Sequence, residues 1–232
     1  FGSSHLYPSA MGGIPSKELL PSGHRVCVHD LRLPSGTPCR IFAPTEAPEG
    51  RVSVFTAGLG PLLRSYWSLI PAKWRVTKAA LRIILEFLLL VLPAARTTVP
   101  AVKDAPPTGT WPLVVFSHGM GLTGVENAVL CTALARSGCV VAVPTHTDGS
   151  AGLVEVNGEK IPIKMPRMEP YDRDFRPNQV RERAAELLAV RDFLLTGPSP
   201  PGLQAACDAG NVYAAGFSFG AATAALAAVL RP

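Results

Sequence analysis

The sequence lacks the patterns that mark disulfide-linked, metal-binding or membrane-spanning proteins. Its five cysteines form no C-x-x-C pair and no grouping with histidine, which argues against a metal centre. Their odd number gives no support for a disulfide framework, so buried free thiols are expected. The longest helical apolar segment, residues 76–92, would measure roughly 25 Å. A membrane-spanning helix needs about 20 residues without internal charges, so we do not expect this segment to span.

An initiating methionine and a signal peptide are also missing. Because the chain begins with Phe1, we expect a fragment or processed product. Its compartment stays open, with a cytoplasmic, peripherally membrane-associated protein favoured over a secreted one. Residues 1–23 are rich in Gly, Ser and Pro and are predicted to be an irregular lead-in. Residues 24–232 are predicted to form a single α/β domain, because 47% apolar composition at this length supports a core of its own.

Acidic residues are scarce between residues 51 and 103, where eight lysines and arginines stand against Glu86 alone. Trp67, Trp74 and a long aliphatic run are interleaved with these cations. That combination favours a membrane or lipoprotein surface as the partner, and no nucleic-acid-binding motif accompanies it.

Within the basic segment, residues 62–92 are predicted to form a helical insertion in the membrane interface. Lys78, Arg82 and Glu86 recur at i, i+4 and i+8, which leaves one narrow polar stripe and a broad apolar face. A core helix packed on the sheet is the alternative, but it would not explain the basic flanks. The side chains expected to dock on lipid are Trp74, Leu81, Leu85 and Leu89.

Apolar runs and helical segments alternate in the second half of the chain. The predicted order is strand 111–117, helix 127–137, strand 139–144, helix 178–195, strand 211–215 and helix 221–230. Continuous apolar strands are typical of parallel sheets that are buried on both faces. The order therefore predicts an α/β fold with a mostly parallel sheet and helices on both faces.

The connecting segments are predicted from local patterns. Residues 25–30 and 39–42 alternate polar and apolar side chains around a Pro-rich turn, which predicts an antiparallel hairpin at a sheet edge. His24 and His29 are expected at the surface or on this edge. A short strand or a loop is expected at 51–57 and a linker at 93–110. Residues 145–170 are predicted to be a long loop that contributes to the substrate wall.

The strongest local signal is Gly216-Phe217-Ser218-Phe219-Gly220, which fits G-x-S-x-G between a strand and a helix. In this motif a strained turn exposes the serine, and small residues on either side let the strand and helix approach. An ordinary strand–helix junction with incidental glycines is the alternative. The matching flanks favour Ser218 as a nucleophile.

An oxyanion hole in such a sheet takes one N–H from the residue after the nucleophile and one from the loop after an earlier strand. The first donor would be Phe219. The loop at 117–121 contains Gly119, and we expect the second donor to be Met120, although a plain Gly-rich turn is the alternative. In this fold the base follows the nucleophile in the chain. The remaining polar residues near these strand ends, assigned to site architecture, are His118, His146 and Asp148.

Four segments resemble, in order and rough spacing, the platelet-activating-factor acetylhydrolases of the plasma type and intracellular type II. These segments are Leu113–Gly121, Thr145–Ala151, Asn178–Ala184 and Gly216–Gly220. The resemblance runs from about Trp67 to Leu230 and implies an α/β-hydrolase fold. It also implies Ser218 as nucleophile, Met120 and Phe219 as oxyanion donors, and a docking helix after Trp74.

The resemblance implies a calcium-independent serine esterase, without cofactor or metal, that hydrolyses the short sn-2 acyl ester of platelet-activating-factor-like phospholipids. A general carboxylesterase or lipase, and a catalytically inactive lipid-binding relative, are the alternatives. The elbow departs from the family in Phe217 and Ala221, which replace His and Gly. The chain ends at Pro232, before the strands that carry the family's triad Asp and His. We therefore expect a fold truncated after the elbow helix and negligible esterase activity of these residues alone.

Overall fold

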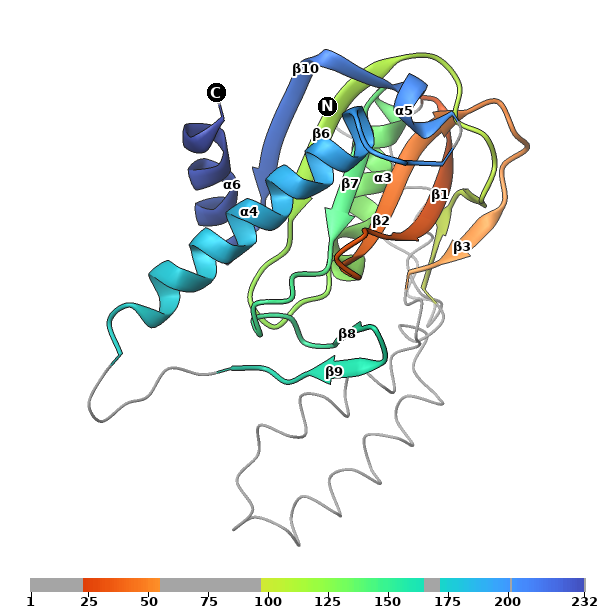
Figure 1. Ribbon diagram of the computed structural model, residues 1–232. Helices are drawn as coiled ribbons and strands as arrows, with labels where there is room; N and C mark the ends of the chain where they lie inside the picture. Colours follow the sequence, from red (N-terminus) through yellow and green to blue (C-terminus); the bar gives the residue numbers. More distant parts are fainter. Residues whose placement is uncertain (1–22, 55–96, 165–171, 201, 232) are drawn as a thin grey trace, which may run out of the picture.

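The computed structural model describes residues 23–54, 97–164, 172–200 and 202–231 (Figure 1). The predicted lead-in before Gly23 and the predicted interfacial helix lie outside the described residues. The four side chains expected to dock on lipid lie outside them as well, so their role stays a prediction.

A six-stranded mixed sheet forms the centre of the domain, in the order β10-β6-β7-β2-β1-β5. Its strands are β1 (Arg25–Arg32), β2 (Pro38–Thr45), β5 (Val102–Lys103), β6 (Trp111–Ser117), β7 (Val140–Pro144) and β10 (Cys207–Gly216). The helices among the described residues are the 3-10 turn η3 (Val125–Asn127), α3 (Ala128–Arg136), α4 (Phe175–Leu195), α5 (Leu203–Ala206) and α6 (Phe219–Leu230). The α/β fold predicted from the alternation of strands and helices is confirmed.

The half of the sheet that carries the G-x-S-x-G motif is parallel. β6 pairs with β7 on one side and with β10 on the other, and Gly216 is in register with Ser117. The crossovers between these strands contain α3 and α4. The carboxyl ends of the three strands therefore lie at the same edge of the sheet, where active sites of open α/β sheets form.

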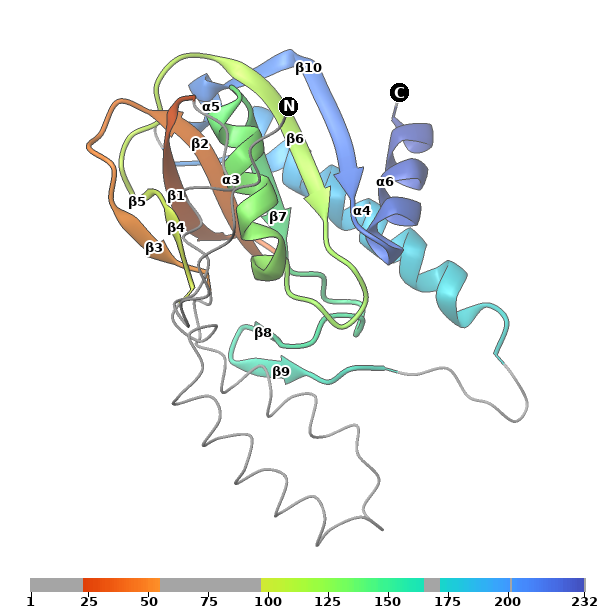
Figure 2. The ribbon, with the colours of Figure 1, turned by 180° about the vertical axis from the view of Figure 1, so that it is seen from behind.

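Alternation along the strands gives the sheet two separate apolar faces. Cys27, Ile41, Leu113 and Val140 face one core, where they pack with apolar residues of α4, α5 and α6. The residues next to them along the strands face the second core, where they pack against Ala128, Cys131 and Ala135 of α3. The strand residues on this face are Val26, Val28, Phe42, Val114 and Val141. Figures 1 and 2, seen from opposite sides, show α4 and α6 on one face and α3 on the other.

The predicted antiparallel hairpin forms as β1 and β2, but β2 lies inside the sheet and not at its edge. β2 also pairs with β7, and the two residues of β5 flank β1. Seven of the eight residues of β2 are buried, as expected for a strand inside the sheet. His29 on β1 is buried too, with Nε2 2.9 Å from the carbonyl oxygen of Ala105, so it is not a surface residue.

Two segments predicted as irregular contain short strands. In the predicted linker, β4 (Thr98–Pro100) pairs with β3 (Arg51–Ser53), and β5 joins the main sheet. In the predicted long loop after β7, β8 (Val154–Val156) and β9 (Glu159–Ile161) form a hairpin. The turn at Asn157 and Gly158, both with positive φ, is the local signal that would have predicted this hairpin.

The five cysteines are free thiols, and all but the half-buried Cys139 are buried. Burial raises the pKa of Cys39, Cys131 and Cys207 to about 12. These three thiols are therefore protonated at neutral pH and are poor nucleophiles.

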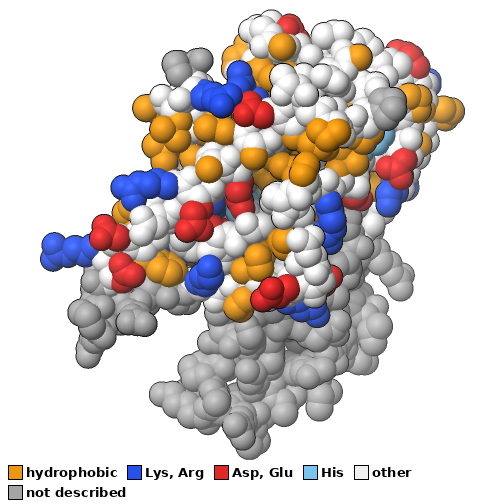
Figure 3. Space-filling model, viewed as in Figure 1, with side chains coloured by type: hydrophobic (Ala, Val, Ile, Leu, Met, Phe, Trp, Pro, Cys, Tyr) orange, Lys and Arg blue, Asp and Glu red, His pale blue; other side chains and the backbone are white. Residues whose placement is uncertain are grey.

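β10 is the terminal strand of the sheet, and α6 packs against it and against α4. A groove of about 280 Å³ lies between these elements and is lined in part by Leu187, Tyr213 and Ala227. Val229 of α6 is 77% exposed. Figure 3 shows hydrophobic side chains over α6, whereas charged ones follow α4 toward its N-terminal end. None of the described helices is long and apolar enough to cross a membrane.

Candidate active site

Ser218 stands at the sharp turn between β10 and α6, with φ 54° and ψ −119°. Few residues other than glycine adopt this conformation, and it persists only where the surrounding structure holds it. In a nucleophile elbow this strained turn projects the serine Oγ from the end of the sheet. The position immediately before α6 also places Ser218 at the positive end of the helix dipole.

The two glycines that flank Ser218 are required by packing. A Cβ on Gly216 would lie 2.2 Å from the carbonyl oxygen of Gly220, and a Cβ on Gly220 would lie 2.1 Å from that of Ser117. Both distances are far below a van der Waals contact. The motif therefore brings β10, α6 and the end of β6 closer together than any side chain would allow.

The loop after β6 lies against the elbow. The N–H of Phe217 donates to the carbonyl of Ser117 at 3.0 Å, and a Cβ on Gly119 would lie 3.2 Å from the ring of Phe217. Among the described residues, no acceptor takes the N–H of Met120 or of Phe219. The two N–H groups predicted as oxyanion donors therefore belong to adjacent segments and are free of internal partners.

His118 is buried and makes two hydrogen bonds that fix its protonation state. Its Nδ1 lies 2.7 Å from the carbonyl oxygen of Gly119, and its Nε2 accepts the N–H of His146 at 3.1 Å. A carbonyl requires a proton on Nδ1, and an N–H requires a lone pair on Nε2, so the ring is neutral. Burial, followed by electrostatic interactions with His146 and Arg183, lowers the pKa of His118 well below its ordinary value.

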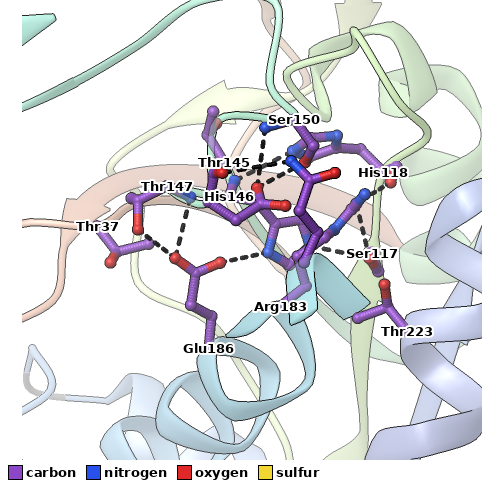
Figure 4. A network of polar contacts seen from close by, with 12 residues as sticks. Thr37, Ser117, His118, Thr145, His146, Thr147, Ser150, Arg183, Glu186 and Thr223 are labelled. Carbon is purple, nitrogen blue, oxygen red and sulfur yellow. Dashed lines mark hydrogen bonds and ion pairs between the residues drawn. The ribbon is translucent and has the colours of Figure 1, made fainter. Parts of the chain in front are cut away.

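His146 is the centre of a second set of contacts, drawn in Figure 4. Its Nε2 lies 2.8 Å from Ser117 Oγ, and its Nδ1 lies 2.5 Å from Glu186 Oε2. Glu186 also accepts the N–H and the hydroxyl of Thr147. Burial raises the pKa of Glu186 and, followed by the charge of Arg183, lowers that of His146. A neutral imidazole that donates from Nδ1 to the carboxylate satisfies all of these contacts.

The Ser117–His146–Glu186 arrangement has the hydrogen-bond order of a catalytic triad, but Ser117 is completely buried. Substrate cannot reach its Oγ, which also accepts a hydrogen bond from Arg183 at 3.1 Å. A nucleophile needs an approach path for the electrophile as well as a base. These residues therefore support the loop after β6 from within and do not themselves react.

The structure places Asp148 in the same polar cluster. Its Oδ1 accepts the N–H of Ser150 at 3.1 Å and the hydroxyl of Ser150 at 2.6 Å, and burial raises its pKa. The carbonyl of Asp148 accepts a hydrogen bond from Gln179 of α4 at 3.3 Å. Asp148 thus connects the loop after β7 to α4.

Sequence reasoning did not single out Ser117, Arg183 or Glu186 as site residues. Arg183 and Glu186 are three residues apart on α4, so they share one face of the helix. Arg183 belongs to the segment 178–184 that resembles the family, but the pattern carries no sign that the helix turns this face toward β6 and β7. Charged side chains on a helix normally face solvent, so the sequence alone predicts that Arg183 and Glu186 are exposed.

The described histidines all contact residues other than Ser218. His118 and His146 belong to the buried cluster, His29 contacts Ala105, and the ring of His24 lies 4.6 Å from that of Trp111. Within the described part of the chain, no hydrogen bond joins Ser218 Oγ to a histidine. In the same residues there is no group of three His, Cys, Asp or Glu that could hold a metal ion.

Comparison with known proteins identifies relatives of the chain. The family model for platelet-activating factor acetylhydrolase, isoform II, matches residues 66–196, which include the loop after β6 and α4. Ser218 lies outside this range, so its candidate role rests on the elbow geometry. A platelet-activating factor acetylhydrolase of Gallus gallus is 29% identical over a segment that covers 42% of this chain and 28% of that protein.

A solved structure resembles the chain over most of its length. The ferulic acid esterase of Streptomyces cinnamoneus superimposes with a TM-score of 0.59 at 21% identity, covering 91% of this chain and 57% of that one. At this identity the likeness concerns the fold, and it agrees with the α/β-hydrolase fold predicted from the sequence. The chain thus spans little more than half of this structural neighbour.

Proposed function

The chain belongs to the platelet-activating factor acetylhydrolase, isoform II, family, and from this premise we propose that it carries the nucleophile of a serine esterase. Its substrate would be the short sn-2 acyl ester, such as acetyl, of a platelet-activating-factor-like phospholipid. The observation that carries the proposal is the elbow at Ser218. The positive φ of this residue and the crowding at Gly216 and Gly220 are features that a plain strand–helix junction does not need.

In the proposed reaction, Ser218 Oγ attacks the ester carbonyl and its proton passes to a general base. The oxygen of the tetrahedral intermediate takes up negative charge and accepts hydrogen bonds from the N–H groups of Met120 and Phe219. The C–O bond to the glycerol oxygen then breaks, and the lysophospholipid leaves with the proton from the base. Water then attacks the acyl carbonyl as its proton passes to the base, the C–O bond to Ser218 Oγ breaks, and the free acid leaves as Oγ takes the proton back from the base.

We propose, as the family resemblance implies, that the base is a histidine that follows Ser218 in the longer protein. The described histidines are committed to other contacts, and the rings of His118 and His146 are completely buried. Burial keeps both rings neutral. Their hydrogen bonds also hold the loop after β6, so recruiting either as the base would dismantle the proposed oxyanion hole.

Support for a phospholipid substrate comes from the family and from the basic segment, because the elbow alone would serve any carboxylic ester. We propose that Trp74, Leu81, Leu85 and Leu89 place the active site on a membrane or lipoprotein surface. Each buried leucine contributes roughly 1.5–3 kcal/mol, and each cation near an anionic surface contributes about 1 kcal/mol. A few such side chains suffice for reversible docking.

The proposal is tested with three esters in a longer form of the protein that also supplies the general base, called the parent here, and in its Ser218→Ala variant. A 2-acetyl phospholipid and p-nitrophenyl acetate should both be hydrolysed, whereas a 2-palmitoyl phospholipid should be hydrolysed at least about tenfold more slowly, and EGTA should have no effect. Ser218→Ala should lower every rate by several orders of magnitude. Equal rates on the short and long acyl chains would favour a general esterase. Turnover that survives Ser218→Ala would overturn the assignment of the nucleophile.

A further inference from the structure

Arg183 has the largest side chain that is completely buried in the described part of the chain. Its Nη2 donates to Ser117 Oγ at 3.1 Å and to the carbonyl oxygen of His118. Its Nε and Nη1 have no hydrogen-bond partner among the described residues. Burying a guanidinium with incomplete partners is costly, and an apolar side chain of similar volume would fill the same space more favourably. A purely space-filling role therefore does not explain an arginine here.

The charge of Arg183 persists at neutral pH. Burial lowers the pKa of Arg183 to about 10, while the charges of Asp148 and Glu186 act in the opposite direction. Its hydrogen bonds go to a carbonyl and a hydroxyl rather than to a carboxylate. Hydrogen bonds from a charged donor are roughly twice as strong as neutral ones, so the guanidinium holds the peptide that follows His118 firmly.

The same guanidinium faces the elbow. Arg183 Cζ lies 4.8 Å from the centroid of the Phe219 ring, within the range of a cation–π contact. Phe219 is the first residue of α6 and contributes one of the two proposed oxyanion N–H groups. The other belongs to Met120, two residues after the carbonyl that Arg183 binds. One side chain thus contacts both segments that supply the donors.

We infer that Arg183 is a positioning residue that clamps the loop after β6 and the start of α6 together, and thereby sets the distance between the N–H groups of Met120 and Phe219. The inference rests on the proposed function for the role of these N–H groups, whereas the clamp rests on the contacts alone. An oxyanion hole works only if its donors are fixed before charge develops. A misplacement of about 1 Å can cost about 100-fold in rate.

The experiment compares Arg183→Met with Arg181→Met, a matched control on the exposed side of α4. Hydrogen–deuterium exchange is measured for peptides that cover residues 117–122, residues 217–221 and the core strand β7. In Arg183→Met, the first two peptides should lose protection together while β7 stays protected. The control should match the parent at all three. This readout needs no enzymatic activity.

The second readout separates positioning from a loss of folded protein. Active serines are titrated with a fluorophosphonate, and kcat for p-nitrophenyl acetate is expressed per titrated serine. Arg183→Met should lower this kcat on the order of 10- to 100-fold with KM within about threefold, since the oxyanion forms only in the transition state. Affinity for a trifluoromethyl ketone, whose adduct with the serine carries an oxyanion, should fall in parallel.

Each outcome decides between the alternatives. Exchange that changes in one segment only, or an unchanged kcat per titrated serine, would overturn the inference. Loss of protection throughout β7 would do so too, because Arg183 would then support the whole core. If Arg183→Met does not fold, Arg183→Lys provides the same comparison with the charge retained. If a longer form of the chain that supplies the base shows no Ser218-dependent turnover, the proposed function fails, and the exchange data alone decide whether the clamp exists.

Discussion

Glu186 Oε2 lies 2.5 Å from His146 Nδ1, and the same carboxylate accepts both the N–H and the hydroxyl of Thr147. All of its partners are donors. Because Thr147 and His146 follow β7 while Glu186 belongs to α4, this one carboxylate joins the strand end to the helix that carries Arg183. The proposed oxyanion loop is therefore supported by Arg183 and His146, which contact it directly, and by Glu186, which holds His146.

Glu186→Gln should destabilise the fold although it keeps the shape of the side chain. One of the two carboxylate oxygens becomes an NH2 group that faces a donor, either His146 Nδ1–H or the groups of Thr147. An unsatisfied buried donor costs about 1–3 kcal/mol, and we expect a loss of that size in urea unfolding. Glu182→Gln, on the exposed side of the same helix, is the control. Equal stability of Glu186→Gln and the control would show that the carboxylate is dispensable.

The buried histidines should make the fold less stable in mild acid. In the unfolded chain each binds a proton near its ordinary pKa of 6.5, but burial lowers the folded pKa of His118 and His146 well below this value. Below pH 6.5 the unfolded state therefore binds more protons, and stability falls as the pH falls. The slope should not exceed about 1.4 kcal/mol per pH unit for each histidine.

This pH effect is isolated by comparing the parent with His118→Gln. The raised pKa values of Glu186 and Asp148 act in the opposite direction. As the pH falls toward their ordinary values of 4.5 and 3.8, the folded state binds protons before the unfolded state does, and this favours folding. Both variants share that contribution, so the difference between their unfolding free energies from pH 7 to pH 5 reports on His118. The parent should lose stability faster with falling pH. Parallel curves would mean that His118 can be protonated in the folded state.

The elbow should not tolerate a methyl group at its second glycine. In Gly220→Ala the added Cβ would lie 2.1 Å from the carbonyl oxygen of Ser117, and only backbone displacement can relieve that contact. We expect this variant to lose several kcal/mol of stability or to be insoluble. Gly210→Ala is the matched control, because its Cβ would meet only Asp208 Oδ1 at 3.3 Å. A soluble Gly220→Ala with parental unfolding behaviour would show that the elbow is looser than described.

The predictable parts of this protein were those encoded locally. The continuous apolar run 111–117 predicted β6, and G-x-S-x-G predicted the junction of β10 and α6, because each depends on neighbouring residues only. The position of β2 inside the sheet was not predictable in this way, because its partner strand β7 lies about a hundred residues later in the chain. The polar cluster around His146 was not predictable for the same reason, because its members come from segments that are far apart in the sequence. Arg183 and Glu186 belong to a helix with many charges, and only the packing of α4 against β6 and β7 selects these two.

The proposed docking surface is tested with Leu85→Glu combined with Leu89→Glu. Two charges on the apolar face should weaken binding to anionic phospholipid vesicles at least about tenfold, because each lost leucine contact contributes roughly 1.5–3 kcal/mol. Turnover of soluble p-nitrophenyl acetate should stay within about twofold of the parent. Lys78→Glu combined with Arg82→Glu tests the electrostatic contribution to vesicle binding. This double variant should weaken binding less at high salt than at low salt. If soluble-ester turnover falls in step with vesicle binding, the segment belongs to the core.

We propose that Ser218, and not the buried Ser117, is the reactive serine. A fluorophosphonate reacts with an activated serine and leaves a stable adduct that peptide mass spectrometry assigns to one residue. In a preparation that hydrolyses p-nitrophenyl acetate, we expect one phosphonyl group per chain on Ser218, an unmodified Ser117, and loss of turnover in proportion to labelling. Labelling of Ser117 or of any other residue, with Ser218 unmodified, would show that Ser218 is not the nucleophile.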